Sequence, residues 1–110
     1  MIEKIVLDYL KDCLTVPIYM ERPINEPDEY VLIEKTGSST ENYMNSATFA
    51  LQSYADSMYL AAKLNEKVKK AMDNIIVLNN IFKSGLNSDY NFTDTAKKKY
   101  RYQAVYDLFY

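Results

Sequence analysis

Residues 43–74 read YMNSATFALQSYADSMYLAAKLNEKVKKAMDN and contain the two clearest secondary-structure signals of the chain. In the first part, apolar and polar residues alternate with the period of two of a half-buried strand, with Ala47, Phe49 and Leu51 on one side. Asp56 or Ser57 can then cap an amphipathic helix that ends near residue 74. The apolar stripe of this helix comprises Met58, Ala61, Leu64, Val68, Ala71 and Met72. The stretch therefore predicts a strand followed directly by a helix.

The elements on the N-terminal side follow from the same periodicities. Residues 2–14 predict an amphipathic helix, with Cys13 on its apolar side as a buried thiol. Residues 16–20 predict a short edge strand, because the proline in this segment cannot donate a backbone hydrogen bond. Residues 21–29 contain two prolines and predict a loop, and residues 30–35 predict an interior strand. Residues 36–42 predict a turn-rich connection.

The C-terminal side adds two more predicted strands. The apolar run at residues 75–82 predicts a fourth strand, and the alternation over residues 101–108 predicts a fifth. Between them, residues 84–99 predict a polar arm or hairpin tip. The order of elements predicts one α+β domain over residues 1–110, with a mostly antiparallel four- to five-stranded sheet covered by two helices.

Composition argues against most catalytic and membrane roles. The chain has 110 residues, no histidine and a net charge of −2, so the commonest proton carrier and transition-metal ligand is missing. No stretch approaches the roughly 20 apolar residues of a membrane helix. Residues 1–60 carry four basic and ten acidic groups, a balance of −6, whereas residues 61–110 carry nine and five, a balance of +4. This polarity favours head-to-tail contacts between copies.

Two short motifs have a chemical and a structural interpretation. Residues 87–94 space oxygen-bearing side chains as a calcium loop does, but the aromatic insertions and the missing central glycine favour a surface turn. Residues 97–102 interleave cations with aromatics, as in a nucleic-acid site. Here we favour the structural interpretation, in which the segment is the charged beginning of a strand and Lys99 and Arg101 are solvated. The chain has eleven tyrosines and no tryptophan, and this abundance of tyrosine favours contacts between subunits. Four tyrosines without a clear place in the predicted core are candidates for such contacts, namely Tyr19, Tyr43, Tyr54 and Tyr110.

The layout resembles the tail terminator and other tail-completion or neck proteins of long-tailed bacteriophages, lambda-like phages in particular. The resemblance covers nearly the whole chain and consists of element order and short motifs. These motifs are Glu21-Arg22-Pro23 with Pro27, Lys35-Thr36-Gly37, Leu51-Gln52-Ser53-Tyr54-Ala55, Ala61-Ala62, Ser88-Asp89-Tyr90-Asn91-Phe92-Thr93-Asp94 and Arg101-Tyr102-Gln103.

The resemblance implies a non-enzymatic virion protein without cofactor or metal. Such a protein forms a hexameric ring on the finished tail tube, stops tube polymerisation and offers a docking surface to head connector proteins. It would be found in the host cytoplasm during assembly and then in the virion neck. Another neck or head-closure role, and a nucleic-acid-binding module that uses residues 97–102, remain as alternatives.

We expect the partner contacts on the two polar connections, residues 36–42 and 84–99, because polar segments outside the core usually carry recognition. Loop position and charge single out six candidate interface residues, namely Arg22, Tyr43, Asp89, Lys97, Lys98 and Lys99.

Overall fold

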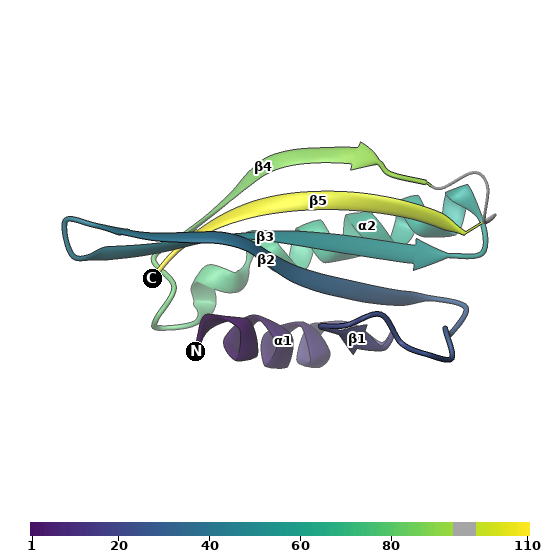
Figure 1. The fold of residues 1–110 in the computed structure, drawn as a ribbon, viewed down its shortest axis with the longest axis horizontal. Coiled ribbons are helices and arrows are strands. Elements are labelled where there is room, and N and C mark those ends of the chain that lie inside the picture. The colour runs from purple at the N-terminus through teal and green to yellow at the C-terminus, as the bar shows by residue number, and fades with distance from the viewer. Residues whose placement is uncertain (94–98) are drawn as a thin grey trace.

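The computed structural model describes residues 1–93 and 99–110 (Figure 1). The elements follow in the order α1 (Ile2–Cys13), β1 (Ile18–Tyr19), β2 (Tyr30–Glu41), β3 (Met44–Ala55), α2 (Met58–Asp73), the 3-10 helix η1 (Ile75–Val77), β4 (Lys83–Asn91) and β5 (Tyr100–Phe109). The predicted α+β class is confirmed. Lys97 and Lys98, and part of the predicted 84–99 arm, lie outside the described residues.

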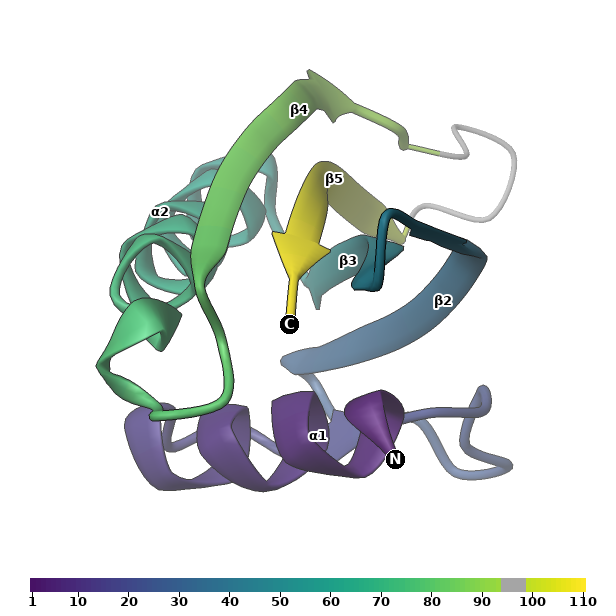
Figure 2. The same ribbon diagram turned by 90° about the vertical axis from the view of Figure 1, so that its left-hand side faces the viewer.

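The five strands form one sheet in the order β1-β2-β3-β5-β4. The two-residue β1 runs parallel to β2, and every other neighbouring pair is antiparallel. Figure 2 shows α1 and α2 on the same side of the sheet, α1 next to β2 and α2 partly behind β4. The predicted mostly antiparallel sheet covered by two helices is therefore correct, although the short parallel strand makes the sheet mixed.

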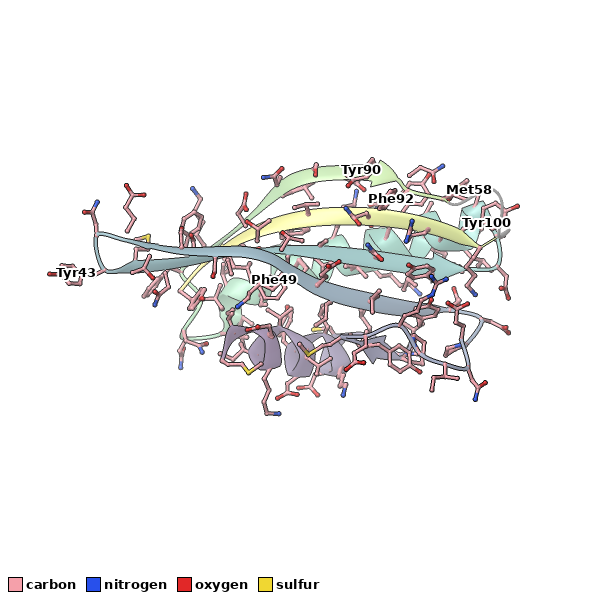
Figure 3. All side chains as sticks on the ribbon, viewed as in Figure 1. Tyr43, Phe49, Met58, Tyr90, Phe92 and Tyr100 are labelled. Carbon is pink, nitrogen blue, oxygen red and sulfur yellow. The ribbon has the colours of Figure 1, made fainter. Side chains whose placement is uncertain are left out.

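The core fills the space between the two helices and the sheet. Phe49 extends into this space from the central strand β3, as Figure 3 shows. Ala47, Phe49 and Leu51 are buried as predicted, but the strand is not half-buried, because Ala50, Gln52 and Tyr54 on its opposite face are buried as well. The larger remaining members are Val6, Leu10, Val31, Ile33, Val68, Met72, Ile75, Tyr106 and Leu108.

Hydrogen bonds from two tyrosines join the layers at this core. The Tyr9 hydroxyl on α1 donates to the Ala71 carbonyl on α2 at 2.7 Å, which ties the two helices together. The Tyr106 hydroxyl on β5 reaches α2, where the Lys69 carbonyl lies at 3.1 Å and the Asp73 carboxylate at 2.8 Å. Each buried phenol thus keeps a polar partner, as buried hydroxyls require.

The helix boundaries have local causes. Ser57 caps α2, because its side-chain oxygen accepts a hydrogen bond from the Leu60 backbone N–H at 3.1 Å. Asn74 ends the same helix. In α1 the buried positions are Ile2, Val6 and Leu10. The predicted burial of Cys13 is wrong: this residue is exposed, because it ends the helix at the edge of an open groove.

Strands β2 and β3 form a hairpin that is longer than the sequence predicted. Residues 36–42 were expected to be a turn-rich connection, but β2 continues to Glu41, and only Asn42 and Tyr43 form the turn. Serine and threonine in this segment are held in strand geometry by cross-strand contacts, such as Ser39 with Ser46 at 2.7 Å. A bulge between Lys35 and Gly37 shifts the register once.

The prediction of a strand at residues 75–82 is also wrong. The chain forms η1 directly after α2, and β4 begins only at Lys83. The apolar run does not alternate between two faces, since Ile75 and Ile81 are buried while Ile76, Val77 and Phe82 are exposed. A short apolar run alone does not define a strand. The described part of the predicted polar arm is instead the edge strand β4, paired with β5.

Replacement of Leu64 by alanine should lower the free energy of unfolding by about 2–5 kcal/mol, because Leu64 is only 4 % exposed and its removal leaves a cavity under the sheet. Lys67, one turn later on α2, faces solvent. Lys67→Ala should therefore change the free energy by no more than about 0.5 kcal/mol. Urea titration of both variants checks this, and equal losses would contradict the assigned helix face.

Stability should decline at alkaline pH. Burial raises the pKa of the Tyr9 phenol to about 12 and also raises the pKa of Tyr106, whose proton is further held by Asp73. Unfolded tyrosine ionises near pH ~10, so above that pH the unfolded chain releases protons that the folded chain retains. The contribution is complete below about pH 10 and is lost as pH rises towards 12. Tyr106→Phe should flatten the decline in urea titrations at pH 8–11, whereas Tyr43→Phe should leave it unchanged.

Candidate functional site

Residues 37–46, here called the hairpin arm, extend the β2–β3 hairpin past the rest of the molecule. The molecule measures 44 × 24 × 24 Å, and Figure 1 shows the arm at one end of the long axis. Asn45 still exchanges two backbone hydrogen bonds with Tyr110, so the last strand pair, Glu41 with Met44, and the turn lie beyond the partners of β3 on the β5 side. A hydrogen bond of 2.8 Å from the Thr40 hydroxyl to the Asn45 side chain supports this two-stranded end.

The tip of the arm holds an unusual turn. Asn42 and Tyr43 have φ angles of 51° and 66°, so both central residues are left-handed, as a type I′ turn requires. Glycine is the usual second residue in such a turn, and a left-handed L-residue costs roughly 1–2 kcal/mol. Tyr43 is nonetheless fully exposed at the far end of the arm (Figure 3). The tip therefore carries an aromatic ring at a backbone cost and without an intramolecular packing gain.

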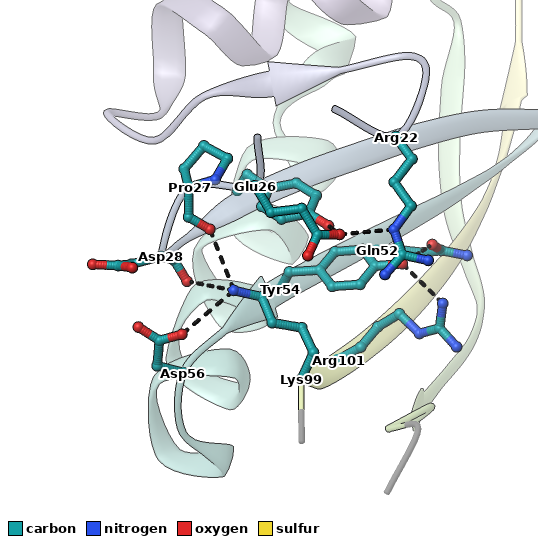
Figure 4. Close-up of polar contacts among 10 residues, drawn as sticks. Arg22, Glu26, Pro27, Asp28, Gln52, Tyr54, Asp56, Lys99 and Arg101 are labelled. Carbon is teal, nitrogen blue, oxygen red and sulfur yellow. Dashed lines mark hydrogen bonds and ion pairs between the residues drawn. The ribbon is translucent and has the colours of Figure 1, made fainter. Parts of the chain in front are cut away.

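A second feature lies on the sheet face that points away from the helices. The Tyr30 and Tyr54 rings stack at 4.5 Å between centroids and 9° between planes, directly across β2 and β3. The Arg101 guanidinium donates to the Tyr54 hydroxyl at 2.8 Å and also lies over the Phe92 ring at 4.1 Å. We call Tyr30, Tyr54 and Arg101 the tyrosine–arginine cluster, and Figure 4 shows the contact between Tyr54 and Arg101.

Loop residues 20–29 fold over the tyrosine–arginine cluster. Arg22 and Glu26 pair at 2.7 Å, and the Tyr30 hydroxyl donates to the same Glu26 oxygen at 2.9 Å. These two contacts, with Arg22 the larger, lower the pKa of Glu26, and the pKa of Arg22 is raised in return. Burial raises the pKa of Tyr30. The loop thus closes one end of the sheet with internally satisfied polar groups.

Polar contacts continue across the sheet from Tyr54. Its hydroxyl donates to Gln52 at 3.0 Å, the Gln52 amide donates to Gln103 at 2.8 Å, and Gln103 donates in turn to the Tyr90 hydroxyl. Both glutamines are buried. Because each amide has a partner on the next strand, this row joins three strands and offers no free acid or base.

The structure distributes the predicted site residues over separate places. Tyr43 occupies the arm tip, whereas Arg22 and Lys99 belong to the region of the tyrosine–arginine cluster. Asp89 on β4 binds α2, through Lys69 at 2.6 Å and Asn65 at 2.7 Å. Of the predicted set, only Tyr43 is fully exposed and free of intramolecular contacts among the described residues.

The predicted solvation of Lys99 and Arg101 is wrong. The Lys99 ammonium, with its side chain 15 % exposed, lies 3.2 Å from each of the Pro27 and Asp28 carbonyls and 3.4 Å from Asp56 (Figure 4). Arg101 is held by Phe92 and Tyr54. Both cations therefore stabilise the chain's own loops. The described part of the 97–102 segment is occupied by internal contacts.

Chemically, the described residues offer surfaces for contact. No group of three described cysteine, aspartate or glutamate side chains is placed to hold a metal ion, and none of the helices in the part of the chain described here is long and apolar enough to cross a membrane. The sequence reading missed the tyrosine–arginine cluster. Tyr30 and Tyr54 stand at the outer ends of two predicted strands, but pairing them requires knowledge of the bulge at residue 36.

Lys99→Glu should destabilise the fold, because a carboxylate would then face two carbonyls and Asp56. Unpaired buried polar groups cost about 1–3 kcal/mol, and we expect a loss of that order in urea titrations. Lys63→Glu on the solvent-facing side of α2 makes the same charge change and should stay within about 0.5 kcal/mol. A Lys99→Glu variant as stable as Lys63→Glu would contradict the bridging role.

Comparison with known proteins gives similarity at the level of the fold. No protein-family model and no curated protein matches the sequence. Among solved structures, a chain described as "Virion of native gene transfer agent (GTA) particle" is similar to this one, with a TM-score of 0.64 and 10 % sequence identity. The match covers 94 % of this chain and 82 % of that chain. This chain therefore shares its fold, over nearly its whole length, with a component of a gene transfer agent virion.

Proposed function

We propose that this protein is a non-enzymatic structural component of the virion of a long-tailed bacteriophage or phage-like particle. The fold similarity to a chain of a gene transfer agent virion is the observation that carries this proposal. Two features of the molecule support it. The hairpin arm carries an exposed aromatic tip, and the glutamine pair and the tyrosine–arginine cluster are joined by internal hydrogen bonds.

Within the virion, we propose that the protein caps the tail tube as a hexameric ring. The element order and motifs that resemble tail terminators support this role over other neck or head-closure roles. A ring requires two different surfaces on each copy, so that each copy binds one neighbour on either side. The acidic first half and basic second half of the chain supply opposite charges for such contacts. Capping would end tube growth and leave the outer face of the ring for head connector proteins.

In this role the protein acts by shape and contact. It would assemble in the host cytoplasm and then remain in the virion, without cofactor or metal. The rigid cluster of Tyr30, Tyr54 and Arg101 would hold one end of the sheet in a fixed shape while the arm contacts a partner. A rigid surface loses less conformational entropy on binding, which favours assembly.

Added to polymerising tail tube protein of the same particle, the purified protein should shorten the tubes and appear at one end only. Electron microscopy measures tube length and the position of the cap, and native mass spectrometry measures the stoichiometry, which should be six. A stoichiometry incompatible with six-fold symmetry would refute the hexameric cap. Tubes of unchanged length, without protein at their ends, would refute tube capping as a whole.

A further inference from the structure

Two exposed surfaces of this chain carry opposite charge and lie at different places on the molecule. One is the tip of the hairpin arm. The other is a groove of about 440 Å³ between the end of α1 and the exposed side of α2. Figure 1 shows the arm at one end of the long axis, and Figure 2 shows the two helices on one side of the sheet.

The groove has an apolar floor and a basic rim. Tyr9, Leu14 and Ala71 line it, and the hydrogen bond from the Tyr9 hydroxyl to the Ala71 carbonyl fixes the floor. Lys67 and Lys70 stand at the rim, both exposed and without an ion pair among the described residues. The cavity falls within the range of about 300–1,000 Å³ typical of ligand pockets, so an aromatic side chain can enter it.

The arm tip carries the matching groups. Glu41 is the sole charged residue of the arm, and Tyr43 and Met44 next to it are exposed apolar side chains. Tyrosine is enriched at the centre of protein interfaces, because it buries a large ring while its hydroxyl keeps a polar partner. Tyr43 has a positive φ, which is unfavourable for a tyrosine. Because backbone strain clusters at functional positions, this conformation supports a role of the Tyr43 side chain in binding a partner.

We propose that the arm tip of one copy inserts into the α1–α2 groove of a second copy, with Tyr43 against the apolar floor and Glu41 facing Lys67 and Lys70. The second copy is the favoured occupant because the acidic tip and the basic groove belong to the same chain and occupy different surfaces. Such a contact is head-to-tail, leaves one tip and one groove free after each addition, and closes when rotation brings the ends together. It deepens the proposed ring function and rests on it.

Cys13, the single cysteine of the chain, lines the groove and is exposed, so it reports on occupancy. Met44→Cys places a second thiol at the tip and leaves Tyr43 and Glu41 intact. On mild oxidation, disulfides between position 44 and Cys13 of another copy should form about tenfold faster than those from an Ile24→Cys control, because docking raises the local thiol concentration. Ile24 is fully exposed in the 20–29 loop, away from the arm. Peptide mass spectrometry identifies each pair.

Two further variants separate docking from chance collision. Adding Tyr43→Gly to Met44→Cys should return cross-linking to the control rate while the melting temperature stays the same or rises, because glycine fits the left-handed turn position. Glu41→Lys, or Lys67→Glu with Lys70→Glu, should each slow cross-linking. Combining the three charge reversals in one chain should restore it.

The proposal is overturned if the 44–13 disulfide forms no faster than the 24–13 disulfide, or if Tyr43→Gly leaves its rate unchanged. If either of these outcomes is observed while rings still cap the tubes, only this contact is excluded and the proposed function is unaffected. Rapid 44–13 cross-linking without any effect on tail tubes would support the contact and refute the capping function.

Discussion

Strands β2 and β3 form eleven residue pairs, in a register that starts at the Asn42–Tyr43 turn and shifts once at Thr36, which is left unpaired. The rest of the sheet depends on that shift. Without the bulge, core residue Ile33 would stand opposite Gln52 instead of Leu51, and a slip of one residue moves every side chain to the other face. The bulge therefore lets one hairpin serve both as an exposed polar arm and as the centre of a core.

Both faces of the sheet follow from this register. On the helix side, Leu51 and Phe49 meet side chains of α1 and α2 in a single core. On the opposite side, Tyr30 meets Tyr54, and Arg101 of β5 then completes the cluster that the 20–29 loop covers. The charged groups of this loop are thus committed to the fold. The surfaces that we propose for partners lie elsewhere, at the arm tip and along the helices.

This division suits a small assembly protein. The described residues form one core, and the stacked and hydrogen-bonded groups of the outer face connect neighbouring strands. The strained tip and the groove between the helices lie at different places on the molecule. The contacts between copies that we propose through these two surfaces would need no rearrangement of the sheet.

The sequence by itself determined the elements whose pattern is local. The period of α2, the apolar core face of β3 and β5, the two-proline loop and the α+β class follow from side-chain spacing over a few residues, whereas the choice of Ser57 over Asp56 as the helix cap came from the structure. Only the tertiary structure decided the rest. Residues 36–41 are a strand because β3 pairs with them, and residues 75–77 are a 3-10 helix because α2 delivers Ile75 into the core. Lys99 is a bridge because distant carbonyls surround it, and Cys13 is exposed because α2 leaves a groove beside it. Each of these depends on contacts between residues far apart in the chain, which spacing along the sequence does not encode.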